Sequence, residues 1–308
     1  MRMIEKVGFV GLGAMGKPMS RRIKQTGFAL GVYDNDAARL EQIAAELSVR
    51  PASSLSALAR ECDAIVTMLP NSTIVEKVLC GEGGVLEGLA PGSLVLEMSS
   101  GDPNSTRMLA ERVQAAGSHL VDAPVSGGVP RAETGELAIM VGGADADVAR
   151  ARPLLEAMGR SIVHTGKVGT AHAMKSLNNL VSAGGFLIGI EALLIGARFG
   201  LDPALMVDVL NASTGMNNST QKKFKQYVLS RSFDAGFGLD LMVKDLSIAL
   251  DVARSTGTTA PFSTLCKDMW AGSKSYLGSG RDHTAVALFS EMLAGSRLEA
   301  GDGENETR

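Results

Sequence analysis

Residues 4–25 read IEKVGFVGLGAMGKPMSRRIKQ, in which a short apolar run at 4–10 meets a glycine-rich turn at 11–16. The apolar run predicts a strand, and the residues after the turn, to about position 25, predict a helix. In such a unit Gly11 permits the tight turn, Gly13 lets a phosphate approach the backbone, and Gly16 lets the helix pack closely on the strand. The helix N-terminus offers N–H groups to the phosphates. The stretch therefore predicts a dinucleotide-binding fold.

The next strand pattern, at 29–33, ends in Asp34. An acid at this distance from the glycine turn accepts hydrogen bonds from both ribose hydroxyls of an adenosine. No arginine follows directly, and Asn35 and Asp36 offer nothing to a ribose phosphate. NAD is therefore the expected cofactor, with NADP as the alternative. The competing interpretation of Asp34 is an acid that caps a turn or a helix.

Strand and helix patterns continue to alternate up to position 165. Such alternation indicates an α/β fold, a Rossmann-type doubly wound parallel sheet whose ligands lie at the carboxyl ends of the strands. Three polar turns mark those ends, at 70–72, 99–101 and 126–128, and the last has two glycines whose N–H groups can surround a carboxylate. An ordinary strand-ending turn is the alternative. The expected strands are 64–69, 94–98, 119–125, 137–141 and 161–165, and the expected helices are 106–116 and 146–158.

Beyond the sheet pattern the chain changes character. Residues 166–198 predict a glycine-bounded turn and a long helix that is apolar nearly all round from 180 to 197, so the helix should be covered on most sides. Further helices are expected at 203–210, 220–229, 239–254 and 284–293. We therefore predict a dinucleotide-binding domain at 1–165, an all-α domain for substrate and oligomer contacts at 166–298 that begins with the interdomain helix, and a polar tail at 299–308.

Polar residues gather near the start of the long helix. Lys175 and Asn179 are four residues apart and project from one face, with His172 one turn earlier. A lysine can take a proton from an alcohol during hydride transfer or return it in reduction, and an asparagine can orient the same oxygen. The alternatives are a solvated lysine and asparagines that serve as local caps.

Composition excludes several classes of protein. A net charge of −3 provides no basic surface for nucleic acid and no polybasic patch for a membrane. Three cysteines without CxxC spacing and four scattered histidines give no metal-ligand pattern and suggest a reducing cytoplasm. The apolar stretch at 180–197 is barely long enough to span a bilayer, and Glu191 and its glycines favour a buried helix. We expect a soluble cytoplasmic protein without metal.

Four motifs, in this order, resemble those of the β-hydroxyacid dehydrogenases, the family of 3-hydroxyisobutyrate dehydrogenase and tartronate semialdehyde reductase. They are GFVGLGAMGKPM at 8–19, DAPVSGGVPRAETGELAIMVGG at 122–143, GKVGTAHAMKSLNN at 166–179 and LMVKDLSIAL at 241–250. Thr170 and His172 depart from the commoner family form, where small residues and glutamine are usual. These departures leave the reaction class unchanged and the substrate open.

The resemblance implies a role for individual residues. Lys175 would be catalytic, Ser126, Gly127 and Gly128 would hold a substrate carboxylate, and Asn179 would contact substrate. Lys244 would close the site near the nicotinamide, although an exposed lysine on an amphipathic helix is the plainer interpretation. The residues expected to bind the cofactor are Gly11, Gly13, Ala14, Met15, Gly16, Asp34, Leu69, Pro70, Ser100 and Lys244.

The expected function is NAD-dependent hydride transfer with a β-hydroxyacid similar to 3-hydroxyisobutyrate. One alternative is a reductase of tartronate, glyoxylate or succinic semialdehyde. Another is a dinucleotide-binding interaction protein without catalysis, which Lys175 disfavours because such a protein needs no proton-transfer residue. A homodimer or homotetramer is expected, because small residues on the long helix suit a subunit interface. Arg131 either reads a second polar group on a longer substrate or pairs with Glu133 or Glu136 on the surface.

Overall fold

The computed structural model describes residues 3–298, so the predicted tail at 299–308 lies outside the described residues. The chain divides into two compact units, which we call the sheet unit, ending at Lys175, and the helical unit, beginning at Ser176. The division falls inside one long helix, α8 (Thr170–Phe199). The boundary predicted at 165/166, where the strand pattern ends, stays a prediction.

The sheet unit contains a sheet of eight strands in the order β2-β1-β3-β4-β5-β7-β6, with β8 paired to β7. The strands from β2 to β5 are parallel, with their carboxyl ends at one edge. Beyond β5 the sheet is mixed, because β7 runs antiparallel to both β5 and β6. The strands are β1 (Lys6–Val10), β2 (Ala29–Tyr33), β3 (Ala64–Thr67), β4 (Leu94–Glu97), β5 (His119–Asp122), β6 (Val125–Ser126), β7 (Leu137–Gly142) and β8 (Gly159–Gly166).

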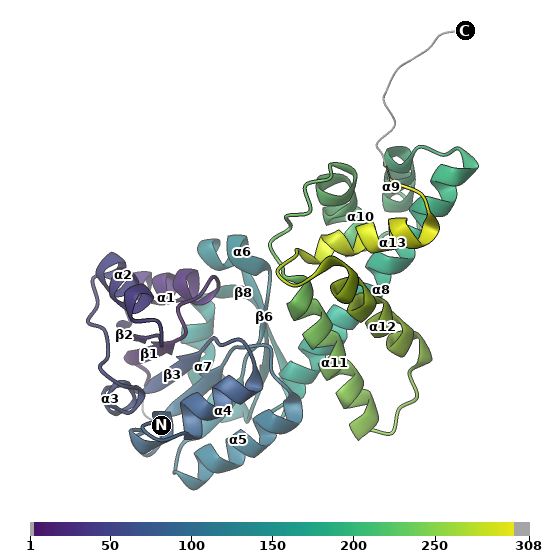
Figure 1. The fold of residues 1–308 in the computed structure, drawn as a ribbon. Coiled ribbons are helices and arrows are strands. Elements are labelled where there is room, and N and C mark those ends of the chain that lie inside the picture. Colours follow the sequence, from purple (N-terminus) through teal and green to yellow (C-terminus); the bar gives the residue numbers. More distant parts are fainter. Residues whose placement is uncertain (1–2, 299–308) are drawn as a thin grey trace. The chain divides into compact units, whose positions relative to one another are not determined.

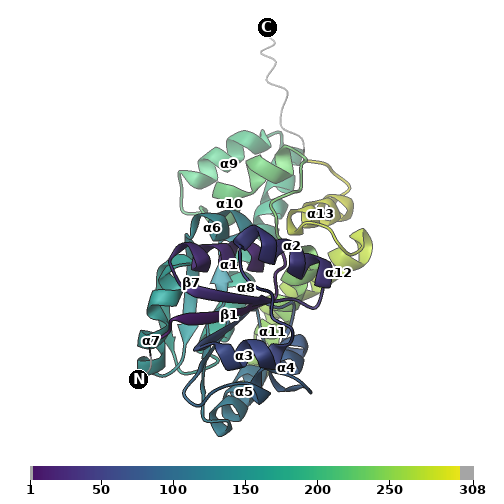
Figure 2. The same ribbon diagram turned by 90° about the vertical axis from the view of Figure 1, so that its left-hand side faces the viewer.

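Helices cover both faces of this sheet (Figures 1 and 2). One apolar cluster joins alternate strand residues such as Val7 and Phe9 to α1, α2 and α7, and a second joins Val10 and Ile65 to α3, α4 and α5. Successive side chains of a strand point to opposite faces, which explains the two clusters. The helices are α1 (Gly16–Gln25), α2 (Ala37–Leu47), α3 (Leu55–Glu61), α4 (Ser72–Cys80), α5 (Pro103–Ala115), α6 (Gly128–Thr134) and α7 (Asp145–Glu156).

The prediction of one strand over 119–125 was wrong. Strand β5 ends at Asp122, and β6 is a separate two-residue strand. Pro124 lies between them and has no N–H to donate to a sheet, so the ladder is interrupted there. The interruption redirects the chain into the turn that carries Ser126 and Gly127.

The helical unit has no strand among its described residues, as the composition indicated. The predicted helix at 220–229 is in fact α10 (Asn218–Lys222) followed by a π-helical segment (Phe224–Leu229). Helix α12 (Pro261–Leu277) was not predicted. The other helices are α9 (Pro203–Asn211), α11 (Leu239–Ser255) and α13 (Val286–Ala294).

Helix α8 is less covered than its composition suggested. Val181, Ile188 and Ile195 follow one another at seven-residue spacing and are 77%, 63% and 71% exposed. The helix is long and apolar enough to cross a membrane by length and composition alone, and 44% of its most apolar window is buried inside the protein. The expectation of cover on most sides is therefore wrong for this stripe of the helix.

Candidate active site

The glycine turn after β1 has the backbone geometry that a dinucleotide requires. Gly11 adopts a φ of +96°, and a Cβ there would lie 2.3 Å from the carbonyl oxygen of Met68. A Cβ at Gly16 would collide with the Gly11 carbonyl, so the helix can begin so close to the strand only with glycine. By contrast, a Cβ at Gly13 would meet no atom within 4 Å. The space over Gly13, at the N-terminus of α1, is thus open to a pyrophosphate.

Asp34 is buried at the end of β2 and holds this turn in place. Its Oδ2 accepts a hydrogen bond of 2.7 Å from the Leu12 N–H, and its Oδ1 accepts one from the Asp36 N–H. A cation that the sequence did not indicate lies beside it, because Arg39 Nη1 is 3.4 Å from Asp34 Oδ1. Arg39 also pairs with Asp36 at 3.3 Å, so two carboxylates face this one guanidinium. The local charge therefore disfavours an added phosphate.

The turns after β3 and β4 are bonded to each other at the carboxyl edge of the sheet. The N–H of Leu69 donates to Ser99 Oγ at 2.9 Å, and the N–H of Asp102 donates to Ser72 Oγ at 2.8 Å. Pro70 and Ser100 lie in these turns and make further contacts. The structure thus brings these cofactor candidates to the edge where the glycine turn also lies.

The turn at 126–128 has the unusual backbone expected of a carboxylate-binding loop. Gly127 has a φ of +134° and Gly128 a φ of +68°, both of which favour glycine. The Arg131 side chain packs over the first of them, since a Cβ on Gly127 would lie 2.6 Å from Arg131 Cδ. The alternative pairing of Arg131 with Glu133 or Glu136 is absent among residues 3–298, where Glu136 pairs with Arg160 at 3.1 Å.

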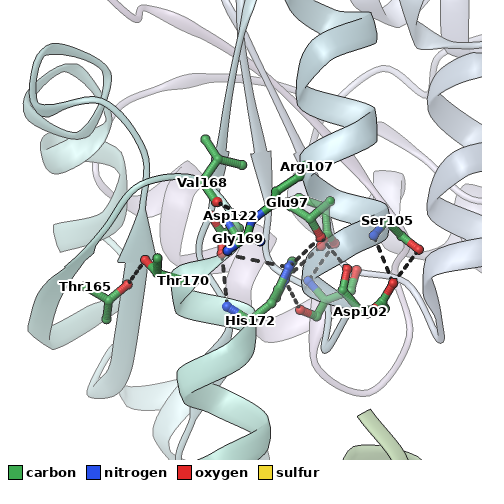
Figure 3. Close-up of polar contacts among 12 residues, drawn as sticks. Glu97, Asp102, Ser105, Arg107, Asp122, Thr165, Val168, Gly169, Thr170 and His172 are labelled. Carbon is green, nitrogen blue, oxygen red and sulfur yellow. Dashed lines mark hydrogen bonds and ion pairs between the residues drawn. The ribbon is translucent and has the colours of Figure 1, made fainter. Parts of the chain in front are cut away.

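The first turn of α8 is bound to the sheet by a buried carboxylate. Asp122, the last residue of β5, accepts hydrogen bonds from the N–H groups of Gly169 at 2.8 Å and His172 at 3.0 Å (Figure 3). A carboxylate at this place satisfies N–H groups that a helix leaves unpaired and complements the helix dipole. Gly142 makes room for it, because a Cβ there would lie 2.4 Å from Asp122 Oδ1.

His172 lies within the same cluster and is only 1% exposed. Its Nε2 is 2.9 Å from Glu97 Oε2 and 2.9 Å from the Ser99 carbonyl oxygen, and its Nδ1 is 2.8 Å from Thr106 Oγ1. These partners come from β4, the turn after it and α5, so the imidazole is held by residues that are distant in the chain. No group of metal-binding side chains is found among residues 3–298.

The remaining candidates lie along α8 and α11. Lys175 is the last residue of the sheet unit and is 7% exposed. Asn179 follows one turn later, in the helical unit, and is also 7% exposed. Asn179 Nδ2 donates to Asp245 Oδ2 at 2.6 Å, and Lys244 Nζ lies 3.4 Å from Asp245 Oδ1. Asp245 thus brings the two candidates of the helical unit together. The plainer interpretation of Lys244 as an exposed lysine fits less well, since its side chain is 25% exposed.

Sequence reasoning missed several residues of these arrangements. Asp122 and Asp245 were present in the quoted motifs but received no role, and Glu97 and Thr106 lie outside those motifs. Each is a buried polar residue whose partner lies on another element, 50 or more positions away in the chain. Local patterns therefore cannot pair them. The acid that ends a strand, as in Asp122, is the signal that could have been used.

Comparisons with known proteins agree with this architecture. Residues 6–166 match the NAD binding domain of 6-phosphogluconate dehydrogenase, and residues 169–289 match the NAD-binding domain of NADP-dependent 3-hydroxyisobutyrate dehydrogenase. The 2-(hydroxymethyl)glutarate dehydrogenase of Eubacterium barkeri is 35% identical over 96% of this chain and 98% of its own length. The mitochondrial 3-hydroxyisobutyrate dehydrogenase of Mus musculus is 37% identical over 91% of this chain and 85% of its own.

A solved structure shows the same fold. The 3-hydroxyisobutyrate dehydrogenase of Mycobacterium tuberculosis with L-serine has a TM-score of 0.86 and 31% identity, and the match covers 94% of this chain and 99% of that one. Both the sheet with its glycine turn and the helical unit have their counterparts in these relatives. The chain therefore belongs to the β-hydroxyacid dehydrogenase family and is an NAD-dependent oxidoreductase of hydroxyacids.

Proposed function

We propose that Lys175 is the general acid/base of this enzyme and that its substrate is a β-hydroxyacid of the 3-hydroxyisobutyrate type. The observation that carries the proposal is the place of Lys175, a buried amine one turn after a helix start that Asp122 fixes. A bound nicotinamide would supply the acceptor for the hydride of the carbinol carbon. Unprotonated Lys175 Nζ accepts the hydroxyl proton in the same direction and returns it in reduction.

Asn179 and Lys244 serve as substrate contacts, with Asp245 as the residue that positions them. Asp245 is 1% exposed and faces both side chains, so it restricts the rotamers of each. Because Asn179 gives one amide hydrogen to Asp245, its other hydrogen remains for a substrate oxygen. Ser126, Gly127 and Gly128 hold the substrate carboxylate through the hydroxyl and backbone N–H groups.

The cofactor residues are those expected from the sequence, with Arg39 added. NAD rather than NADP is supported by the paired negative charges of Asp34 and Asp36 around Arg39. Removing one acid should release Arg39 toward a 2′-phosphate. Asp34→Ser should therefore raise the ratio of kcat/KM for NADP to that for NAD by about tenfold or more, and a higher kcat/KM with NADP in the unchanged enzyme would contradict the assignment.

A longer substrate is a second candidate, because Arg131 packs on the proposed carboxylate loop and is exposed. It has no ion pair among the described residues, which leaves its guanidinium available to a second acidic or hydroxyl group. The relative named 2-(hydroxymethyl)glutarate dehydrogenase has a substrate with such a second carboxylate. Reduction of a semialdehyde acid would use the same residues in the opposite direction.

The exposed stripe of α8 supports a homodimer or homotetramer. Large exposed apolar patches on soluble proteins mark interaction sites, and Val181, Ile188 and Ile195 lie exposed at seven-residue spacing along one face of the helix. We expect Ile188→Glu to lower the sedimentation coefficient toward that of a monomer. The three thiols are all unbridged, which supports a cytoplasmic protein.

The decisive experiment is a steady-state assay of NAD reduction with a panel of acids, including 3-hydroxyisobutyrate, serine and 2-(hydroxymethyl)glutarate. Absorbance of the reduced nicotinamide reports turnover directly. The reverse assay with tartronate and succinic semialdehydes gives the preferred direction. Turnover of simple alcohols as fast as of the acids would refute a carboxylate-binding loop at 126–128.

A further inference from the structure

The cluster around His172 contains two carboxylates, and a neutral imidazole would leave their negative charge unbalanced. Glu97 ends β4 and Asp122 ends β5, and both carboxylates are almost completely buried. Glu97 Oε2 lies 2.9 Å from His172 Nε2, and Asp122 Oδ2 lies 3.9 Å from His172 Nδ1 (Figure 3). Two buried carboxylates with no cation would be strongly unfavourable, so the ring is the group that can supply the balancing charge.

The hydrogen bonds of the ring can be counted independently of its charge. At Nε2 both neighbours, the Glu97 carboxylate and the Ser99 carbonyl, only accept, so Nε2 must carry a proton. At Nδ1 the neighbour is Thr106 Oγ1, whose single proton also has an acceptor 3.0 Å away in the Asp102 carbonyl oxygen. If the threonine donates to that carbonyl, Nδ1 must donate to the threonine. Both ring nitrogens are then protonated.

Each element packed against the ring contributes a known group. Strands β4 and β5 contribute the two carboxylates, and α5 contributes Thr106 and, at its N-terminus, Asp102, whose carboxylate is bonded to Ser105. Arg107, also on α5, donates to the Val168 carbonyl oxygen at 3.4 Å, in the turn before α8. Helix α8 itself contributes a second cation, Lys175, three positions after His172. The imidazole is the cation that lies 2.9 Å from Glu97.

We propose that His172 is a positioning residue, an imidazolium that ties the first turn of α8 to the carboxyl ends of β4 and β5 and thereby fixes the backbone from which Lys175 projects. Lys175 follows His172 by three positions, so the two side chains leave neighbouring parts of one helix face. If the first turn of α8 rotated or shifted relative to β4 and β5, Lys175 Nζ would move with it. The proposal rests on the role of Lys175 proposed above.

The pKa of His172 agrees with this charge. Burial by itself lowers it, but the charge and hydrogen bond of Glu97, the charge of Asp122 and the Ser99 carbonyl outweigh burial, so the pKa is raised above its ordinary 6.5. Burial raises the pKa of Asp122, against the opposing effects of the His172 charge and of the two N–H groups. The direction of this shift favours the imidazolium, whose charge is lost as the pH rises through the raised pKa.

The first test measures catalysis in His172→Gln, which keeps a donor amide but removes the charge. We expect kcat to fall about 10- to 100-fold because the amine is displaced, with KM for NAD changed by less than about twofold. The matched control is His119→Gln, which removes a histidine 3.2 Å from Asp147 at the other end of β5, with a side chain 47% exposed. The control should leave kcat and KM unchanged.

A double-variant cycle tests whether charge pairing is the cause. Glu97→Gln removes the partner carboxylate. The kcat of the double variant Glu97→Gln/His172→Gln should be within about threefold of the kcat of the slower single variant. Multiplicative losses would show that the two residues act separately and would overturn the proposal. A fall in kcat accompanied by an equal weakening of NAD binding would also overturn it, since that indicates general damage to the sheet unit.

The second test reads the charge in the unchanged enzyme and needs no variant of the cluster. The chain has four histidines, so imidazole ¹⁵N–¹H spectra contain few signals, and His119→Gln and His164→Gln remove those of the two partly exposed rings. We expect one buried ring to stay doubly protonated at a pH where an ordinary imidazole has lost its proton. If every ring were neutral there, the proposal would fail. If instead the enzyme oxidised no hydroxyacid while this signal persisted, the proposed function would fail and the charged cluster would stand.

Discussion

Two histidines are buried in this chain, one in each unit, and their surroundings differ. His172 in the sheet unit lies between acceptors, the carboxylates of Glu97 and Asp122. His283 in the helical unit lies among aromatic rings, stacked on Trp270 with centroids 6.4 Å apart. Its Nδ1 is near the Phe237 carbonyl oxygen at 3.1 Å and near Asp282 at 3.3 Å.

The two pKa values shift in opposite directions. Burial lowers the pKa of His283, the charge of Lys223 adds to this effect, and Asp282 does not compensate. Burial also lowers the pKa of Lys223, to about 8, despite the charge of Asp282. The pKa of His172 is raised because its carboxylates outweigh the same penalty. Burial alone therefore does not decide whether a group is charged, and the sheet unit keeps its charge next to the proposed chemistry.

The largest effect is expected from the lysine one turn beyond the charged cluster. Lys175→Ala should lower kcat by about 100- to 10,000-fold, since the proton acceptor is lost, while the Kd for NAD measured by calorimetry stays nearly unchanged because the glycine turn is intact. Lys167→Ala, an exposed lysine just before α8, is the control. A parallel loss of NAD affinity would mean that Lys175 holds the structure instead of moving a proton.

The aromatic surroundings of His283 should matter for stability. Trp270 is fully buried and also contacts Phe186, so Trp270→Ala should lower the free energy of unfolding by about 3–5 kcal/mol in urea titrations followed by circular dichroism. Phe262→Ala on the same helix, where the side chain is 87% exposed, should change it little. A variant of Trp270 that folded stably but bound NAD poorly would contradict the separation of roles between the two units.

Arg131 tests whether charge at the sheet edge also selects the substrate. Arg131→Ala should lower kcat/KM for an acid with a second carboxylate by about 10- to 100-fold, equivalent to about 1.4–2.7 kcal/mol, and hardly affect 3-hydroxyisobutyrate. Arg160→Ala, which breaks the pair with Glu136, is the control in the same region. Small and equal effects on long and short acids would leave Arg131 as a surface residue.

The smallest effect concerns stability against pH, where the two histidines should act with opposite sign. The raised pKa of His172 gives stability that is complete below 6.5 and lost as the pH rises through its folded value. The lowered pKa of His283 means that the unfolded chain gains a proton first as the pH falls below 6.5, so stability declines on the acid side.

Single variants separate these two limbs. His172→Gln should flatten the alkaline decline and His283→Gln the acid decline in urea midpoints measured across pH. The single tryptophan, Trp270, reports the helical unit by fluorescence, and circular dichroism reports both units. Declines of the same sign for both histidines would show that burial, and not the partners, sets the charge.

The order of elements and the nature of the cofactor could be predicted from the sequence. Local signals suffice for these features, because the spacing of Gly11, Gly13 and Gly16 after an apolar run specifies a strand, a turn and a helix within about 20 neighbouring residues. The motif containing Lys175 and Asn179 likewise needs only helical spacing. Pro124, which ends the strand earlier than predicted, shows that even a local signal can be overlooked.

Only the tertiary structure decided which polar groups meet. Asp122 accepts hydrogen bonds from N–H groups at the start of a helix that begins nearly 50 residues later, and Asn179 and Asp245 are 66 residues apart. The packing also decided that the stripe through Ile188 stays exposed although its composition is that of a core. Such pairings depend on how strands and helices pack, and the free energy of a buried charge depends on every group around it, which no short stretch of sequence contains.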